Sequence, residues 1–462
     1  MRRPVFAQKC LCLLFGLSAS VSIQAAPYDV IDLGVFGDTG SYNFAFGINN
    51  LNQVVGNAEG ALIPADQLTE GTVAETCLAG NIISVREFCN HAYFYEMALI
   101  TDLGALDTGS SYAFAINDST TAVGYATEEF DNGDPDVLNP VTDRAVVSLN
   151  GQPLTAIPFP VEVENLNAGV TPLQRALDIN NSNQVAGYTL LRFVSDDDTE
   201  AAIVVRPYIY DLLNETYTFI PMYSDNIQRA GNARAINEAG AVAGWANSED
   251  DERNNPITAL YWDPATPEFS QDLGTLGGFS SEAYDLNDNG IIVGVSDTDT
   301  NFFRNESLAF YYDIATETMN QIPEFSEVSE FTNSQALAVN DSNQVVGSAQ
   351  VSASFESINA AFLYQVGDDS ITNLNDMIDC DLGWDLVLAR DINDAGYIIG
   401  TGTLDGEVRS FMLVPTSDTT PTNCTQPNSD EPGSGDDSSS SSMGFIAILL
   451  AGFVLLRRRF RI

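Results

Sequence analysis

The segment DLGTLGGFSSEAYDLNDNGIIVGVS, residues 272–296, contains the pattern that decides the fold. In this segment an Ala stands four residues before an Asn, and a Gly stands seven residues after that Asn. The same spacing occurs seven times along the chain. The Asn and Gly residues are Asn49/Gly56, Asn117/Gly124, Asn180/Gly187, Asn237/Gly244, Asn287/Gly294, Asn340/Gly347 and Asn393/Gly400. The alanines that precede them are Ala45, Ala113, Ala176, Ala233, Ala283, Ala336 and Ala389. Seven copies of one unit indicate a repeat architecture.

Each repeat has the pattern of four short strands. Around the quoted segment, these are an apolar run at Ala259–Trp262, the DLG stretch at Ser270–Leu276, an alternating stretch at Ser281–Asn287 and an aliphatic run at Ile291–Val295. Turn residues separate them, and helical periodicity is absent. Four short strands in about fifty residues are typical of a propeller blade.

The Asn-to-Gly spacing itself predicts a hairpin. In INDAGYIIG, residues 392–400, one strand ends at Ile392 and the next contains Ile398 and Ile399. The Asn-Asp-x-Gly residues between them supply the side-chain-to-backbone bonds and the positive φ of a tight turn. We therefore assign the seven repeated Asn residues to turns. The repeated Ala predicts close approach of a neighbouring blade at that point.

Strand counting predicts that the repeats form a closed ring. An apolar run precedes six of the seven repeats, and the copy missing before the first repeat follows the last one as Ser410–Val414. If this last strand joins the first blade, one blade takes three strands from one end of the chain and one from the other. Closure of this kind removes exposed sheet edges. We expect an all-β, seven-bladed β-propeller over residues 26–415. The alternative is an open β-solenoid, which would be expected to end in polar caps.

The repeat resembles that of the HAF family of bacterial extracellular repeat proteins. Pieces of the quoted segment recur as HAYFY from His91 and as TDLGALDTGSSYAFAIND from Thr101. The third, fourth, sixth and seventh repeats keep the Asn-to-Gly spacing but lack the DLG-x-LGG part. The resemblance covers residues 28–415 and implies a secreted repeat protein of Gram-negative bacteria. It carries over no catalytic residues.

The two ends of the chain predict export and membrane attachment. Residues 1–25 have basic residues, an apolar run and small residues before the expected cleavage site, as in a secretory signal peptide. Residues 416–442 form a Ser/Gly/Asp-rich linker, which is expected to be flexible. Met443–Leu456 is apolar, though shorter than the roughly 20 residues of a usual membrane span. The basic residues 457–462 after this segment predict a cytoplasmic tail.

This C-terminal region resembles the glycine-glycine sorting signals that rhomboid-type intramembrane proteases process. Ser438–Ser442 stand where that family has its Gly pair. The resemblance implies attachment at the cell envelope or cell surface, with release after processing as an alternative. The export machinery and a sorting protease would then be partners of the chain.

Charge and cysteine content exclude some binding partners and predict disulfides. All 64 acidic residues lie within residues 26–442, where the basic residues are 11 Arg and no Lys. Such a surface repels nucleic acid and anionic membranes. An even number of cysteines in an exported chain predicts two disulfides. We expect Cys77–Cys89 as a local bridge and Cys380–Cys424 as a bridge to the segment after the repeats.

The inventory of reactive side chains predicts no catalytic centre. His91 is the single histidine and lies in an expected strand, so we assign it a structural role. The absence of Lys from the mature region removes Schiff-base chemistry. Asp285, Asn287 and Asn289 fit the first half of a calcium loop, but Ser296 stands where the loop needs Glu. These three residues form a weak calcium candidate, and no other cofactor is expected.

These features favour a non-enzymatic binding or scaffold module at the cell envelope, with a protein or glycan of the cell surface as its ligand. Function would then lie in irregular insertions such as residues 59–90 and 127–143. The alternative is a carboxylate-dependent hydrolase of extracellular polysaccharide, since two carboxylates suffice for that chemistry.

Overall fold

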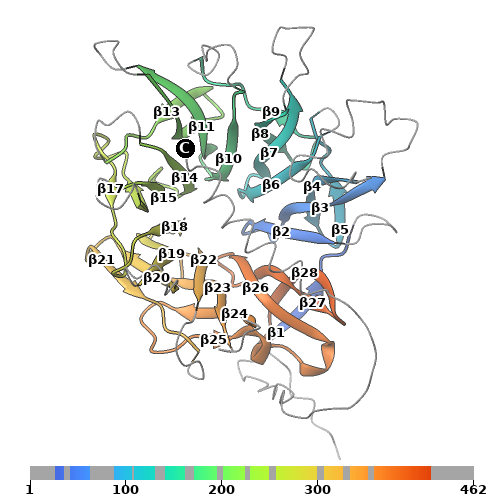
Figure 1. The fold of residues 1–462 in the computed structure, drawn as a ribbon. Coiled ribbons are helices and arrows are strands. Elements are labelled where there is room, and N and C mark those ends of the chain that lie inside the picture. The colour runs from blue at the N-terminus through green and yellow to red at the C-terminus, as the bar shows by residue number, and fades with distance from the viewer. Residues whose placement is uncertain are drawn as a thin grey trace, which may run out of the picture.

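The computed structural model shows seven four-stranded antiparallel sheets arranged around a central axis (Figure 1). This arrangement confirms the all-β, seven-bladed β-propeller. The structure describes residues 27–35, 42–62, 88–106, 109–130, 141–161, 171–194, 201–223, 229–248, 256–298, 306–325, 333–351 and 358–417. The signal segment, the linker and the C-terminal apolar segment that the sequence predicts lie outside these residues.

The strands that build the sheets are short. They are β1 (Tyr28–Asp32), β2 (Asn43–Ile48), β3 (Val54–Leu62), β4 (Phe88–Glu96), β5 (Leu99–Asp102), β6 (Ser111–Ile116), β7 (Thr121–Glu129), β8 (Val141–Leu149), β9 (Thr155–Ala156), β10 (Gln174–Ile179), β11 (Gln184–Val194), β12 (Ala201–Asp211), β13 (Thr216–Phe219), β14 (Gly231–Ile236), β15 (Val242–Asn247), β16 (Ile257–Trp262), β17 (Gln271–Asp272), β18 (Ser281–Leu286), β19 (Ile291–Asp297), β20 (Ser307–Asp313), β21 (Thr318–Gln321), β22 (Ser334–Val339), β23 (Gln344–Gln350), β24 (Asn359–Gln365), β25 (Thr372–Asn373), β26 (Trp384–Ile392), β27 (Ile398–Leu404) and β28 (Glu407–Pro415). Two 3-10 helices, Leu374–Met377 and Cys380–Leu382, precede β26.

Six blades are continuous in sequence. They are blade 1 (β2–β5), blade 2 (β6–β9), blade 3 (β10–β13), blade 4 (β14–β17), blade 5 (β18–β21) and blade 6 (β22–β25). The first strand of each blade is the one that ends just before a repeated Asn. In blades 1 and 4, the DLG stretch begins at the end of the fourth strand. The boundary between blades therefore falls after the DLG stretch.

Blade 7 joins the two ends of the described chain. Its strand order is β1-β28-β27-β26, and β1 pairs with β28 from Tyr28 opposite Pro415 to Asp32 opposite Phe411. Three strands thus come from the C-terminal part and one from the N-terminal part. This division differs from the expected one, in which the last strand joins the first blade, because the DLG strand ends a blade instead of beginning one.

The hydrophobic core lies in the seams between neighbouring blades. Seven buried clusters occur in the described chain, and each draws its residues from two adjacent blades. In the seam of blades 1 and 2, for example, Val55 and Ala92 pack with Ala113 and Ile116. All seven repeated Ala residues are at most 1% exposed. The methyl group is small enough for the two sheets to approach each other here, as the sequence predicts.

The repeated Gly is required by a β-bulge in the first strand. In blade 2, Ala113 pairs with Gly124 and the register then shifts, so that Ala115 pairs with Val123. The bulge turns the carbonyl of Tyr112 toward Gly124. A Cβ at any of the seven glycines would lie only 1.8–2.1 Å from the carbonyl oxygen of the residue that precedes the repeated Ala. Steric exclusion therefore explains why the spacing always ends in Gly.

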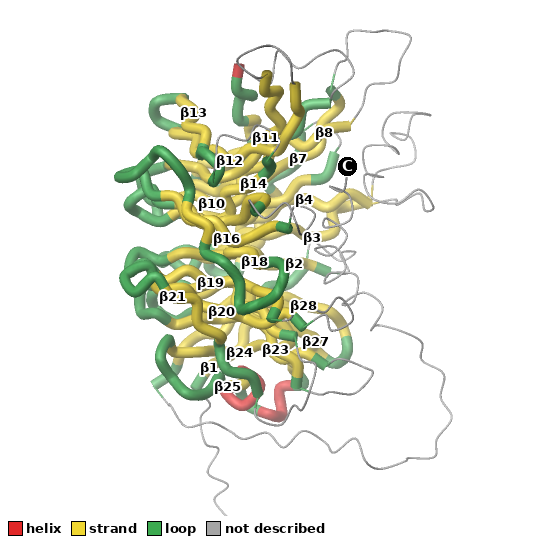
Figure 2. Tube along the Cα trace, turned by 60° about the vertical axis from the view of Figure 1, so that its left-hand side comes forward, coloured by secondary structure: helices red, strands yellow, loops and turns green. Residues whose placement is uncertain are grey.

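The ring has two unlike faces. The turn face carries the connections between first and second strands and between third and fourth strands, and the loop face carries all the others. On the turn face, four or five residues join the first two strands of every blade. On the loop face, the connections between second and third strands range from two residues, 405–406, to 25 residues, 63–87. Figure 2 shows turns of the turn face, such as β12–β13 and β20–β21, projecting on one side of the ring.

Candidate functional site: the central cavity

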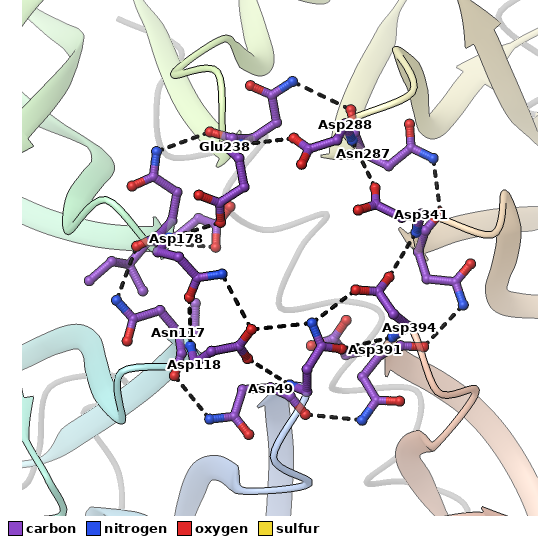
Figure 3. Close-up of a pocket in the computed structure, with 18 of the residues that line it drawn as sticks. Asn49, Asn117, Asp118, Asp178, Glu238, Asn287, Asp288, Asp341, Asp391 and Asp394 are labelled. Carbon is purple, nitrogen blue, oxygen red and sulfur yellow. Dashed lines mark hydrogen bonds between the residues drawn. The ribbon is translucent and has the colours of Figure 1, made fainter.

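The repeated Asn side chains form a closed ring of hydrogen bonds at the centre of the turn face (Figure 3). Each Nδ2 donates to the backbone carbonyl of the equivalent Asn in the next blade. The bonds run from Asn49 to Asn117 (2.9 Å), Asn117 to Asn180 (3.0 Å), Asn180 to Asn237 (3.0 Å), Asn237 to Asn287 (3.4 Å), Asn287 to Asn340 (2.9 Å), Asn340 to Asn393 (3.0 Å) and Asn393 back to Asn49 (3.0 Å). The repeated Asn thus joins each blade to its neighbour.

The same Asn side chain also holds its own turn. Asn117 Oδ1 accepts hydrogen bonds from the backbone N–H groups of Ser119 and Thr121, both at 3.0 Å. This is the side-chain-to-backbone bond that the sequence predicts for a tight turn. A single buried amide therefore serves as turn cap through its oxygen and as inter-blade bond through its nitrogen. The second role is absent from the sequence-based assignment.

A second closed ring is made by the residues that follow the repeated Asn, which we name the mouth residues. They are Asn50, Asp118, Asn181, Glu238, Asp288, Asp341 and Asp394. Each backbone N–H donates to a side-chain oxygen of the mouth residue in the next blade, at 2.8–3.0 Å. The position of the side chain is thus the same in all blades, while its identity varies among Asn, Asp and Glu.

Three aspartates lie deeper in the ring, two residues before the repeated Asn. They are Asp178 in blade 3, Asp285 in blade 5 and Asp391 in blade 7. One oxygen of each accepts the N–H of the next residue in sequence, at 2.8 Å. The other accepts an N–H of the following blade, from Ile236, Val339 and Ile48 respectively, at 2.8–2.9 Å. Each carboxyl group therefore bridges a seam between two blades.

The surroundings favour the neutral form of these three carboxyl groups. Burial raises the pKa of Asp178 to about 6, against the effect of its two N–H bonds. Burial, and then the charge of Asp178, raise the pKa of Asp285 to about 7. Burial, followed by the charges of Asp285 and Asp178, raises the pKa of Asp391 well above its usual range. The three groups are thus coupled through the interior of the ring.

These rings enclose a cavity of about 210 Å³ to which all seven blades contribute. Seven of its lining residues are acidic, and among the described residues that line it none is basic. The acidic residues are Asp118, Asp178, Glu238, Asp288, Asp341, Asp391 and Asp394. Burial raises the pKa of Asp341, and the charges of Asp394 and Asp288 raise it further. The five acidic mouth residues concentrate negative charge in this concave site, and such a concentration attracts cationic groups.

The residues of the calcium candidate, Asp285, Asn287 and Asn289, lie beside this cavity, and each forms hydrogen bonds with a different part of the ring. Asp285 uses both oxygens on N–H groups, and Asn287 Oδ1 accepts from Asn289 and Ile291. Asn289 donates its Nδ2 to the carbonyl of Asp341. Within the described chain, no three His, Cys, Asp or Glu residues are grouped as metal ligands. The Asn-rich loop acts here as a hydrogen-bonded turn.

The other residues singled out from the sequence lie away from the cavity. His91 lies in β4, as the sequence predicts, and its Nδ1 lies 2.9 Å from Oδ2 of Asp102 in β5. Cys380 is disulfide-bonded. Cys77 and Cys424 lie outside the described residues, as do the greater parts of the insertions at residues 59–90 and 127–143. The pairing expected for Cys77 and Cys89 stays a prediction.

The cavity has a signal in the sequence that strand patterns alone do not reveal. A polar residue that accepts hydrogen bonds follows all seven repeated Asn residues, and Asp stands two positions before three of them. Because the first strands of all blades converge on the axis, residues at equal positions in different repeats become neighbours. Reading each repeat separately assigns these side chains to isolated turns.

The ring and its enclosed acidic cavity define a seven-bladed β-propeller closed by hydrogen bonds between blades. The chain belongs to the family described as "Protein of unknown function (DUF3466)", whose model matches residues 106–412. No curated protein matches the chain.

Several solved structures show similarity at low identity. Dipeptidyl peptidase 4 of Porphyromonas gingivalis is 11% identical with a TM-score of 0.40, over 77% of this chain and 48% of that protein, so the chain spans about half the peptidase. An oligogalacturonate lyase in complex with manganese is 11% identical with a TM-score of 0.44, over 85% and 97%. The β-propeller domain of the trilobed protease from Pyrococcus furiosus is 10% identical with a TM-score of 0.44, over 83% and 97%. These similarities assign no activity to the present chain.

No helix among the described residues has the length and hydropathy needed to cross a membrane. The apolar segment Met443–Leu456 lies outside that part of the chain.

Proposed function

We propose that this protein is an exported, non-enzymatic binding module of the cell envelope that holds a cationic group of a partner protein in its central cavity. One observation carries the proposal: seven acidic residues and no basic residue line the cavity among its described lining residues. The envelope location rests on the sequence of residues 1–25 and 443–456. The export machinery and a sorting protease are the further partners that this location implies.

The chemistry of the mouth residues suits binding better than bond cleavage. Asp288, Asp341 and Asp394 each use one carboxylate oxygen on an N–H of the preceding blade. These bonds fix the carboxylates in place before any ligand arrives, which lowers the entropic cost of binding. A cavity of this volume accommodates a side chain such as that of Lys or Arg, but not a long polysaccharide segment.

The proposal is tested with a labelled lysine-rich peptide as the probe and the full-length protein as the receptor. The triple variant Asp288→Asn, Asp341→Asn and Asp394→Asn removes three charges from the cavity. Asn already occupies the equivalent position in blades 1 and 3, where Asn50 Oδ1 and Asn181 Oδ1 accept the N–H of the preceding blade, so the ring tolerates the change. We expect the variant to bind the peptide at least about tenfold more weakly at low ionic strength, measured by fluorescence anisotropy.

A matched variant controls for net charge. Asp211, Asp263 and Asp313 cap outer turns through Oδ1, and the amide oxygen of Asn preserves that bond. Changing these three to Asn removes the same charge far from the cavity and is expected to leave peptide affinity within about twofold. Equal loss in the two variants would contradict the proposal. Turnover of a polysaccharide by the wild-type protein would favour the hydrolase instead.

A further inference from the structure

The first strands of the seven blades direct one backbone N–H each toward the central cavity, at the residue before the repeated Asn. These residues are Ile48, Ile116, Ile179, Ile236, Leu286, Val339 and Ile392, and all seven line the cavity. A buried N–H without a partner costs stability, so each needs an acceptor. The three deep aspartates supply six acceptors, because each carboxyl group takes two N–H groups.

The odd number of blades explains why the aspartates occur where they do. Asp178, Asp285 and Asp391 stand in alternate blades and link blade 3 to 4, blade 5 to 6 and blade 7 to 1. The three aspartates together accept the N–H groups of six of the seven blades, and the N–H group of blade 2 has no aspartate to accept it. Among the described side chains, none accepts the N–H of Ile116 in that blade. A side chain at Gly47, the equivalent position of blade 1, is excluded because its Cβ would lie 2.6 Å from the carbonyl oxygen of Phe114.

We propose that Asp178, Asp285 and Asp391 are proton-linked clamps, which hold three blade seams, including the closing seam, most firmly when their carboxyl groups are protonated. A neutral carboxyl group accepts two N–H bonds through its two oxygens and still has an O–H to donate. Ionisation keeps both bonds but places three negative charges around one small cavity. The clamps are part of the ring itself and require no ligand.

The charged groups around the clamps support this assignment. Asp391 faces Asp285 and Asp178 across the ring, and Arg390 lies beside it. Asp178 faces Glu238, and Asp285 faces Asp341. Burial lowers the pKa of Arg390 to about 10, still far above neutrality, so this cation is present throughout the range considered. It does not reverse the effect of burial and of the neighbouring carboxylates on Asp391, whose pKa remains raised.

The sign of the pH effect follows from these shifts. A carboxyl group whose pKa is higher in the folded than in the unfolded state binds more protons when folded. Between about pH 4 and pH 7 folding therefore takes up protons at the clamps. Their contribution to stability is greatest below the unfolded-state pKa and falls as the pH rises through the folded-state value. Ordinary surface aspartates contribute nothing to this pH dependence because their pKa is nearly the same in the folded and unfolded states.

The test follows individual N–H signals by NMR in the full-length protein labelled with ¹⁵N-isoleucine. Ile48, Ile179, Ile236 and Ile392 donate to clamp carboxyls, and Ile116 is a built-in control. We expect the Ile179 and Ile236 signals to titrate with a midpoint of about pH 6, the Ile48 and Ile392 signals to titrate well above the range of an ordinary aspartate, and the Ile116 signal to stay unchanged. Constant shifts above about pH 5 would overturn the proposal, as would an Ile116 signal that moves with the other four.

A single substitution separates one clamp from the others. Asp391→Ala introduces the residue that blades 2, 4 and 6 carry at this position, as Ala115, Ala235 and Ala338. We expect the titration of the Ile48 and Ile392 signals to disappear, while those of Ile179 and Ile236, which report on Asp178, persist. A titration of Ile48 that survives in Asp391→Ala would contradict the clamp. The wild-type titration decides the question even if this variant does not fold.

Discussion

The turn face and the loop face of the ring differ in how constant their sequence is from blade to blade. On the turn face, the spacing of four or five residues between the first two strands is kept in all seven blades, and the repeated Asn residues bond to one another around the axis. On the loop face, equivalent connections differ from two to 25 residues. The repeated Asn residues thus bind blade to blade on the turn face, while variation in connection length is confined to the face that lacks the repeated Asn.

On the turn face, the position of the mouth residues is constant while their amino-acid type varies. They occupy the same place in every blade, but only some of them are charged, with Asp288, Asp341 and Asp394 in consecutive blades. The acidity of the cavity is therefore uneven around a regular frame. A ligand would meet a rigid ring whose chemistry changes from blade to blade.

The largest expected effect comes from breaking the bulge that supports the turn face. Gly124→Ala places a methyl group against the carbonyl of Tyr112, and backbone on both sides prevents relaxation. We expect a loss of about 4 kcal/mol in the free energy of unfolding, or failure to fold. Urea denaturation followed by circular dichroism measures the loss.

A glycine of the loop face supplies the control for this variant. Gly406 has φ of +84° in the β27–β28 turn, and no atom lies within 4 Å of an added Cβ. Gly406→Ala therefore meets backbone strain alone, which costs about 1 kcal/mol. Equal destabilisation at the two positions would show that the bulge does not require glycine for steric reasons.

The next largest effect is expected when one bond of the Asn ring is removed. Asn117→Ala eliminates the bond to the Asn180 carbonyl and leaves the N–H groups of Ser119 and Thr121 without their acceptor. We expect a loss of roughly 2–3 kcal/mol, because Asn117 is only 4% exposed. Asn359→Ala, at the loop-face end of β24, should change stability by less than about 0.5 kcal/mol. A small effect at Asn117 would mean that water replaces the inter-blade bond.

The sequence is sufficient to predict the number of blades, because turn residues, alternation and the spacing of Ala, Asn and Gly recur together. The DLG stretch is likewise held by residues that are close in sequence. Asp102 Oδ1 accepts the Gly104 N–H at 2.7 Å, and Gly104 has φ of +72°. These are local features. The clamps of Asp178, Asp285 and Asp391 depend on residues 54–58 positions away, or 343 at the closing seam, so no local pattern predicts them.

The clamps predict a moderate effect of pH on the turn face. For Asp178, whose pKa burial raises to about 6, the full difference from the unfolded state corresponds to about 3 kcal/mol. Part of this is lost below pH 5, so we expect the Asp178 contribution to the free energy of unfolding to fall by roughly 1–2 kcal/mol between about pH 5 and pH 8. In Asp178→Ala, urea denaturation at the two pH values should show a smaller fall than in the wild type. An unchanged pH dependence would contradict a role of Asp178 in it.

The smallest effect is expected from an ion pair of the loop face. Arg409 lies 2.7 Å from Glu407 next to the β27–β28 turn, and the Glu407 side chain is 71% exposed. An exposed pair of this kind contributes little because solvent screens the charges and two long side chains lose freedom. Glu407→Gln should therefore change the free energy of unfolding by less than about 0.5 kcal/mol, with Arg409→Gln as the matched variant. A loss above about 1 kcal/mol would place part of the ring's stability on the loop face and remove the contrast between the two faces.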